Sequence, residues 1–176
     1  METVFNRLFI AIPAPVIMKE VLVSLREVNA ALKNVRWIRE QNLHVTVYFL
    51  GNVEIVHIPL IQAAMEQCLQ AAPPFTLQLD AITFEGGKLG KPSMVWARFH
   101  RNKQFTLLAG AIGKRVGPYV AAPSKFSDPV PHVTLARIKP GPVPDISVKV
   151  VCEIEFKGYE LWRSISIPTG VRYEKI

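Results

Sequence analysis

The sequence contains the triplet His-Val-Thr twice, at residues 44–46 and 132–134, and each copy lies in a run rich in β-branched and aromatic residues. The two copies are half a chain length apart in a protein of 176 residues. This spacing predicts two similar halves, each of which contributes one His and one Thr to a shared cleft.

Alternation along the two runs separates polar from apolar side chains. Successive side chains of a β-strand point to opposite faces, so His44, Thr46 and Tyr48 are expected on one face and their apolar neighbours on the other. The second run places His132 and Thr134 on one face in the same way. Each run therefore predicts a strand with one core face and one face that carries chemistry.

The remaining pattern predicts an α+β fold with two mainly antiparallel sheets flanked by helices. Apolar spacing predicts helices at 16–33 and 59–70 and a third helix capped by Asn102. A change of parity predicts a bulge near Ala81. Strands are expected at 7–12, 35–38, 75–84, 94–99, 148–156, 160–167 and 171–175, in addition to the two His-Val-Thr runs. We expect residues 1–176 to form a single domain of two closely packed lobes.

Composition narrows the class of partner and the compartment. The net charge of +7 favours a polyanionic partner such as nucleic acid or a nucleotide, although charge alone does not identify a nucleic-acid enzyme. Cys68 and Cys152 are too few for a disulfide framework and lack metal-ligand spacing, which indicates a reducing cytosol; a single bridge between them stays open. The first apolar run, Leu8 to Ile12, fits neither a signal peptide nor a spanning helix. We expect a cytoplasmic protein that does not associate with membranes.

Two histidines on opposite sides of one cleft can serve as an acid and a base, because the unperturbed pKa of His is near 6.5. Cleavage through a cyclic phosphate needs that pair: one imidazole takes a proton from the attacking oxygen and an imidazolium protonates the departing one. The hydroxyls of Thr46 and Thr134 can donate to phosphate oxygens. The scheme predicts His44 and His132 as catalytic residues and requires no metal.

Two less specific interpretations compete with catalysis. A lone His on a strand is most often a hydrogen-bonded structural residue, but a duplicated triplet is hard to explain in that way. A zinc site is disfavoured because two His without a nearby Cys, Asp or Glu set supply too few ligands. His57 and His100 lack the companion Thr and are expected at the surface.

These motifs resemble those of the 2H phosphoesterase superfamily, and more closely those of its RNA 2′,3′-cyclic phosphodiesterases, also called the 2′-5′ RNA ligase family. The likeness covers nearly the whole chain. It rests on an opening strand at residues 7–12, a first His-x-Thr signature at 35–37 and 42–51, a second at 131–137 and a closing segment at 161–174.

The resemblance implies a bilobal, pseudo-symmetric fold with the two His in the cleft between lobes. It implies hydrolysis of an RNA or nucleotide 2′,3′-cyclic phosphate to a 2′-phosphate without metal, cofactor or ATP, with reversible 2′-5′ ligation as a side activity. By family analogy His44 is the acid and His132 the base, and ligation exchanges these duties. Thr46, Thr134 and Arg137 are implied to bind phosphate, although ideal alternation puts Arg137 on the wrong face unless the strand twists, bulges or ends. No obligate protein partner is expected, and the chain is expected to be a monomer.

Further residues are weaker candidates. Tyr48 and Phe49 are candidates near the base or ribose, with core packing as the alternative for Phe49, and Arg7 either faces the cleft or flanks a strand. Three lysines, Lys88, Lys91 and Lys125, are candidates for contacts with an RNA backbone, with solvated charge as the alternative. Two other functions stay open: a related activity on 2′-5′ oligonucleotides or small cyclic nucleotides, and a noncatalytic RNA clamp.

Overall fold

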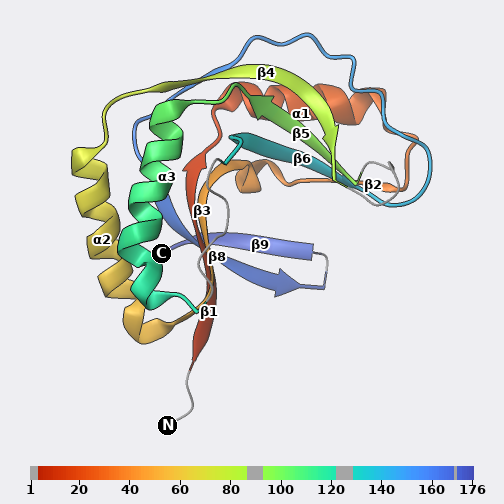
Figure 1. Ribbon diagram of the computed structural model, residues 1–176. Helices are drawn as coiled ribbons and strands as arrows, with labels where there is room; N and C mark the ends of the chain where they lie inside the picture. Colours follow the sequence, from red (N-terminus) through yellow and green to blue (C-terminus); the bar gives the residue numbers. More distant parts are fainter. Residues whose placement is uncertain (1–3, 87–92, 122–128, 169) are drawn as a thin grey trace.

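A computed structural model describes residues 4–86, 93–121, 129–168 and 170–176 (Figure 1). The helices in these ranges are α1 (Val16–Val28), α2 (Ile58–Ala71) and α3 (Lys103–Val116). The strands are β1 (Phe5–Pro13), β2 (Val35–Trp37), β3 (His44–Glu54), β4 (Thr76–Glu85), β5 (Met94–Phe99), β6 (His132–Ile138), β7 (Glu153–Glu155), β8 (Glu160–Ile167) and β9 (Gly170–Lys175). The predicted α+β class is confirmed.

The strands form one curled antiparallel sheet in the order β7-β4-β5-β6-β3-β1-β8-β9, and β2 pairs with β6. The two predicted sheets are therefore two halves of one sheet. They are joined between β3 and β6, where Val45 pairs with Val133. Both of these side chains are fully buried. This join is the central feature of the fold because it brings the two His-Val-Thr triplets side by side.

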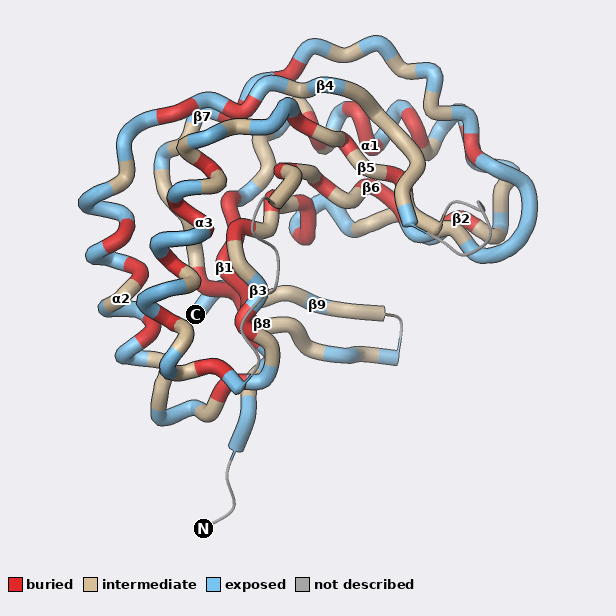
Figure 2. Tube along the Cα trace, in the orientation of Figure 1, coloured by how far each residue is buried: buried red, intermediate tan, exposed pale blue. Residues whose placement is uncertain are grey.

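The helices cover the sheet on the face away from the two His. In Figure 1, α2 and α3 lie side by side against the half that contains β1 and β3, and α1 lies behind β5 and β6. The buried faces of α2 and α3 follow the predicted apolar spacing, and Figure 2 shows the buried positions recurring along each helix. Helix α1 instead buries Met18, Val21, Leu22 and Leu25 and leaves Val28 63% exposed. The Asn102 side chain accepts hydrogen bonds from the backbone N–H groups of Gln104 and Phe105, which confirms the predicted cap of α3. None of the described helices is long and apolar enough to cross a membrane.

Helix α1 ends at Val28, five residues before the predicted end. The cause is Asn29, which is buried with 5% of its surface exposed. Its side-chain amide donates to the carbonyls of Leu25 and Asp145, and its oxygen accepts from the backbone N–H of Asp145 at 2.7 Å. A buried amide needs such partners, so the contact with a distant segment ends the helix.

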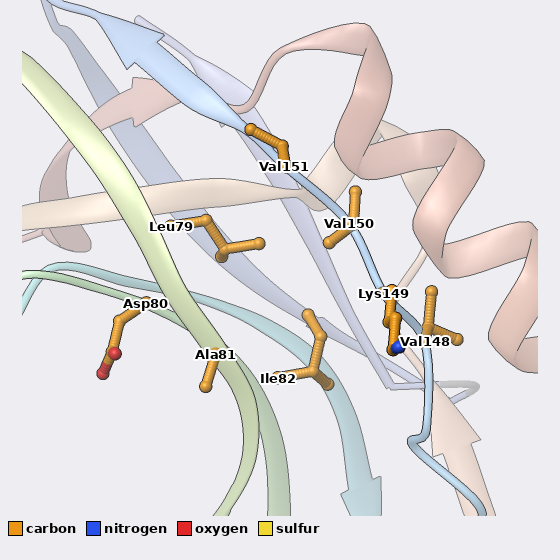
Figure 3. Close-up of a pocket in the computed structure, with 8 residues that line it drawn as sticks. All are labelled: Leu79, Asp80, Ala81, Ile82, Val148, Lys149, Val150 and Val151. Atoms are coloured by element: carbon orange, nitrogen blue, oxygen red, sulfur yellow. The ribbon is translucent and has the colours of Figure 1, made fainter.

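The predicted strand at 148–156 forms a ladder only over β7. Before β7 the chain runs beside β4, and the last bond between them joins the Leu79 N–H to the Cys152 carbonyl. A groove lies between this segment and β4, and Leu79 and Ile82 point toward Val150 across it (Figure 3). The predicted bulge near Ala81 is confirmed, because the register of β4 on β5 shifts between Leu79 and Ala81.

The Val45–Val133 join gives a stability prediction. Val45→Ala should lower the free energy of unfolding by about 2 kcal/mol, because it removes two buried methyl groups and leaves a cavity. Urea unfolding would measure the loss. Val56→Ala is the matched control at a side chain that is 71% exposed, and it should cost less than about 0.5 kcal/mol. Equal losses in the two variants would contradict the role given to the join.

Candidate active site

The register at the join sets the geometry of the candidate site. With Val45 opposite Val133, antiparallel pairing continues with His44 opposite Thr134 and Thr46 opposite His132. These four half-buried side chains share the face opposite the two valines. Direct neighbours in such a pair have Cβ atoms about 5 Å apart and diagonal neighbours, here the two His, roughly 7 to 8 Å apart. A local two-fold axis through the valine pair thus relates one His-Thr pair to the other.

Both imidazoles are held in the same way. Nδ1 of His44 donates to the Asn42 carbonyl at 2.7 Å, and Nδ1 of His132 donates to the Val130 carbonyl at 2.8 Å. A carbonyl only accepts, so Nδ1 carries the proton in each ring and Nε2 of the neutral ring is an acceptor. Each partner lies two residues before its His, so the hydrogen bonds obey the same local two-fold axis as the strands.

Aromatic rings surround His44. Its ring centroid lies 4.9 Å from that of Phe9 and 5.2 Å from those of Trp162 and Tyr173. Phe9, Ala11 and Trp162 form a small buried cluster separate from the main core, with Tyr173 packed against it. These contacts come from β1, β8 and β9, so one half of the sheet encloses this imidazole.

The surroundings of His132 come from the other half. Trp96 on β5 stacks on His132, with ring centroids 3.5 Å apart and planes 12° apart. Arg98, also on β5, pairs with His132 in the sheet register and forms ion pairs with Asp80 and Glu85. A face-stacked ring and a nearby carboxylate therefore distinguish His132 from His44.

The pKa values of both His are lowered. Burial lowers the pKa of His44 to about 4, against a raising effect of its bond to Asn42, and repulsion from His132 lowers it further. Burial also lowers the pKa of His132, while its bond to Val130 and the charge of Glu85 raise it. Charge repulsion between the rings is consistent with their closeness. At neutral pH the free protein holds both as neutral imidazoles.

A β-bulge brings Arg137 to the His face. The pairing of β5 with β6 passes from Trp96–Thr134 to Val95–Ala136, so Leu135 is an extra residue, and Leu135 and Ala136 are both fully buried. Arg137 then pairs with Met94, which shares the face of Trp96. Ideal alternation places Arg137 on the face opposite His132, and this bulge moves it to the same face.

The equivalent bulge in β3 makes the predicted position of Tyr48 wrong. The pairing of β1 with β3 passes from Ala11–Thr46 to Ile10–Tyr48, so Val47 is the extra residue. Tyr48 consequently packs on α3, where a Cβ on Gly113 would lie 2.7 Å from its ring. Helix α3 runs through Gly113 to Val116, and the missing side chain at Gly113 leaves room for the Tyr48 ring.

Phe49 follows the bulge in β3 as Arg137 follows the bulge in β6. Each lies five residues after its His, so the local two-fold axis makes the two positions equivalent. The Phe49 side chain is 42% exposed, and the Arg7 guanidinium lies 5.2 Å from the centre of its ring. Phe49 is therefore on the His face rather than in the core.

The other predicted residues lie elsewhere. His57 is half-buried beside Tyr119, and His100 is an exposed residue whose Nδ1 lies 3.7 Å from an Asp80 oxygen. Lys88, Lys91 and Lys125 lie outside the described residues. Cys68 and Cys152 are both free and buried.

The sequence analysis missed the residues that orient the imidazoles. Asn42 is buried; its carbonyl holds His44 and its side-chain amide donates to the Val171 carbonyl of β9. Trp96 lies in an alternating run, so the sequence predicts that its side chain and that of Val95 point to opposite faces of the sheet. The pattern does not reveal the strand register that stacks Trp96 on His132. Neither contact has a local sequence signal.

Comparison with protein families gives one broad match. Residues 17–157 match the family described as the 2′-5′ RNA ligase superfamily. The match contains both His-Val-Thr triplets and most of the sheet.

Two curated relatives carry the name RNA 2′,3′-cyclic phosphodiesterase. The protein from Archaeoglobus fulgidus is 26% identical over 180 residues, covering 97% of each chain. The protein from Thermotoga maritima is 25% identical over 146 residues, covering 78% of this chain and 75% of its own.

Solved structures share the fold. The protein TT0787 of Thermus thermophilus superposes with a TM-score of 0.82 at 25% identity, covering 97% of this chain and 94% of its own. Escherichia coli LigT in apo form superposes with a TM-score of 0.69 at 20% identity, covering 98% and 95%. The fold is thus that of the LigT-like 2H phosphoesterases.

The lowered pKa of His44 predicts a pH-dependent stability. The folded value of about 4 lies below the ordinary 6.5, so the unfolded chain takes up the proton first as pH falls. The contribution of His44 to the free energy of unfolding is therefore constant above pH 6.5. Between pH 6.5 and about pH 4 it falls by on the order of 3 kcal/mol. His44→Gln should therefore show a shallower fall in unfolding free energy than wild type over this range.

Urea unfolding at stepped pH values would measure both slopes. His100→Gln is the control for loss of an imidazole whose side chain is 63% exposed. Parallel pH curves for wild type and His44→Gln would contradict the buried, neutral state of His44.

Proposed function

The chain belongs to the 2′-5′ RNA ligase superfamily, and on that premise we propose that it hydrolyses an RNA or nucleotide 2′,3′-cyclic phosphate to a 2′-phosphate. His44 and His132 are the acid and base of this reaction. The observation that carries the proposal is the pairing of the two triplets at Val45–Val133, which puts two oriented imidazoles on one face, diagonal to one another. The names of the two curated relatives support it.

The chemistry requires each ring to act through Nε2, since Nδ1 is engaged with a carbonyl. One neutral Nε2 takes a proton from water, whose oxygen forms a bond to phosphorus. The bond from phosphorus to the 3′ oxygen breaks, and the protonated Nε2 of the other ring gives its proton to that oxygen. Thr46 and Thr134 donate hydrogen bonds to the phosphate oxygens as charge builds there.

Arg137 and Phe49 would hold the parts of the substrate beside the phosphorus. Arg137 is on the His face, exposed, and its guanidinium can bind phosphate through charge-assisted hydrogen bonds. Phe49 offers an exposed ring on which a base or ribose can stack. The two lie on opposite sides of the four His and Thr residues, so one nucleotide end can contact both.

The reaction needs one charged imidazole, and we attribute that charge to the bound state. Family analogy makes His44 the acid and His132 the base. In the free protein burial lowers the pKa of both rings, and at His132 the charge of Glu85 partly offsets it. A bound phosphate anion raises the pKa of both rings. Proton uptake with the substrate would therefore supply the charged imidazole. Ligation, as the reverse reaction with a ribose hydroxyl in place of water, exchanges the two duties.

The direct test is turnover of a nucleoside 2′,3′-cyclic phosphate and of an oligonucleotide with the same end, in EDTA, with products resolved by chromatography. His44→Ala and His132→Ala should each lower kcat/KM about a hundredfold or more, because each removes an acid or base. His100→Ala, an exposed His away from the join, is the control and should retain the wild-type rate.

Absence of turnover on every such substrate by the wild-type protein would reject the proposal. If the double variant of His44 and His132 also kept its RNA affinity, the noncatalytic clamp would replace it. Cleavage of 2′-5′ linkages or of a small cyclic nucleotide alone would instead point to a related 2H activity.

A bell-shaped pH profile is the second expectation, because one ring must be charged and the other neutral. The kcat/KM profile reports the free protein, where both pKa values are lowered, so its maximum should lie on the acid side of neutrality, between about 4 and 6.5. The kcat profile should peak at higher pH, since bound phosphate raises both values. Initial rates at stepped pH would measure both curves, and a flat profile from about pH 5 to 9 with chemistry rate-limiting would contradict the pair.

A further inference from the structure

Two arginines face one another beside the candidate site. In the pairing of β2 with β6, Arg36 lies directly opposite Arg137. Paired residues of an antiparallel ladder share a face, so both lie on the His face. Like charges directly opposite one another destabilise a sheet. The pairing is therefore costly unless an anion lies between the two guanidinium groups.

Other arginines and lysines near this face are already partnered within the described residues. Their partners are carboxylates or an aromatic ring: Arg98 with Asp80 and Glu85, Lys175 with Glu160, and Arg7 over Phe49. Neither Arg36 nor Arg137 has a carboxylate partner in the described part of the chain. The polar contact of Arg137 there is with the Met94 sulfur at 3.9 Å.

Arg36 also spans the two halves of the sheet. Arg36 lies on β2. Strands β2 and β3 both pair with the same edge of β6, so Arg36 and His44 lie one after the other along that edge. Its guanidinium reaches β9, where a Cβ added to Gly170 would lie 3.5 Å from Nη1 of Arg36. In Figure 1 the β8–β9 hairpin and the β6–β2 end of the sheet extend in the same direction. Arg36 thus lies at this outer end, next to Arg137.

Its separation from the candidate phosphate site is about one nucleotide. From Thr134 to Arg137 the strand advances by roughly 7 to 10 Å, the range reflecting the bulge at Leu135. The same advance separates His44, opposite Thr134, from Arg36, opposite Arg137. A phosphodiester adjoining the terminal nucleotide would therefore reach Arg36 while the cyclic phosphate is held between the imidazoles.

We propose that Arg36 binds a second phosphate, the phosphodiester that precedes the terminal nucleotide of an RNA strand. This inference rests on the proposed function, because the cyclic phosphate fixes where the strand begins. Arg36 thereby makes the site selective for an RNA end over a free mononucleotide. Arg137 serves the terminal phosphate, and the second phosphate offsets the repulsion between the two guanidinium groups.

The test compares three substrates with a 2′,3′-cyclic phosphate: a mononucleoside, a trinucleotide, and the trinucleotide with an uncharged methylphosphonate as its last internucleotide linkage. Wild type should prefer the charged trinucleotide about tenfold in kcat/KM, the size expected for one charged hydrogen-bonded contact. Arg36→Gln should lose that preference and leave the mononucleoside rate unchanged. On the methylphosphonate substrate, Arg36→Gln and wild type should give equal rates.

Lys114→Gln is the matched control. It removes one positive charge from an exposed residue of α3, the helix that packs against the opposite face of β3. It should change all three rates alike and by little. A tenfold loss in this variant too would attribute the effect to overall charge.

A binding measurement separates failure of this inference from failure of the proposed function. The product trinucleotide, which ends in a 2′-phosphate, and its methylphosphonate form are titrated into each protein, so turnover is not needed. Arg36→Gln should weaken binding of the charged form alone, about tenfold, and lower the slope of log affinity against log salt by about 0.7. Equal binding of both forms by wild type, or equal losses on all substrates in Arg36→Gln, would overturn the assignment of Arg36.

Discussion

The pairing of Val45 with Val133 is the interaction on which the rest of the structure depends. It joins the two halves of the sheet and lies at the centre of the two His-Val-Thr triplets. Because both valines are fully buried, the register is fixed by the core. A slip of one residue in either strand would turn that strand's imidazole into the apolar interior and expose its valine. Hydrophobic burial on one face therefore determines the chemistry available on the other.

Two bulges then determine which residues join that face. Val47 and Leu135 each add one buried residue shortly after the Thr, and each reverses the alternation that follows. The sequence allowed a bulge as one way to bring Arg137 to the His face, but it offered no reason to expect the same event in β3. Alternation therefore predicts the wrong face for Tyr48. Ideal alternation already places Val47 and Leu135 in the core, so neither residue marks the bulge in the sequence.

Much of the fold could be predicted from local patterns. The apolar spacing of α2, the cap at Asn102 and the bulge beside Ala81 are all properties of short segments, and all are present. The duplicated triplet also predicted which His and Thr side chains would lie together. The sequence could not predict the early end of α1, because Asn29 finds its partner at Asp145, 116 residues away. The stacking of Trp96 on His132 likewise depends on a register set by the whole sheet.

The equivalence of Phe49 and Arg137 has a consequence for orientation. The local two-fold axis makes the four His and Thr residues nearly indifferent to which way round a ligand enters. The axis also relates the aromatic ring of Phe49 to the guanidinium of Arg137, and these two groups bind different parts of a ligand. A molecule turned end for end would set its anionic end against the ring and its planar ring against the cation. The difference at this one pair of positions therefore gives a nearly symmetric site a preferred direction for its ligand.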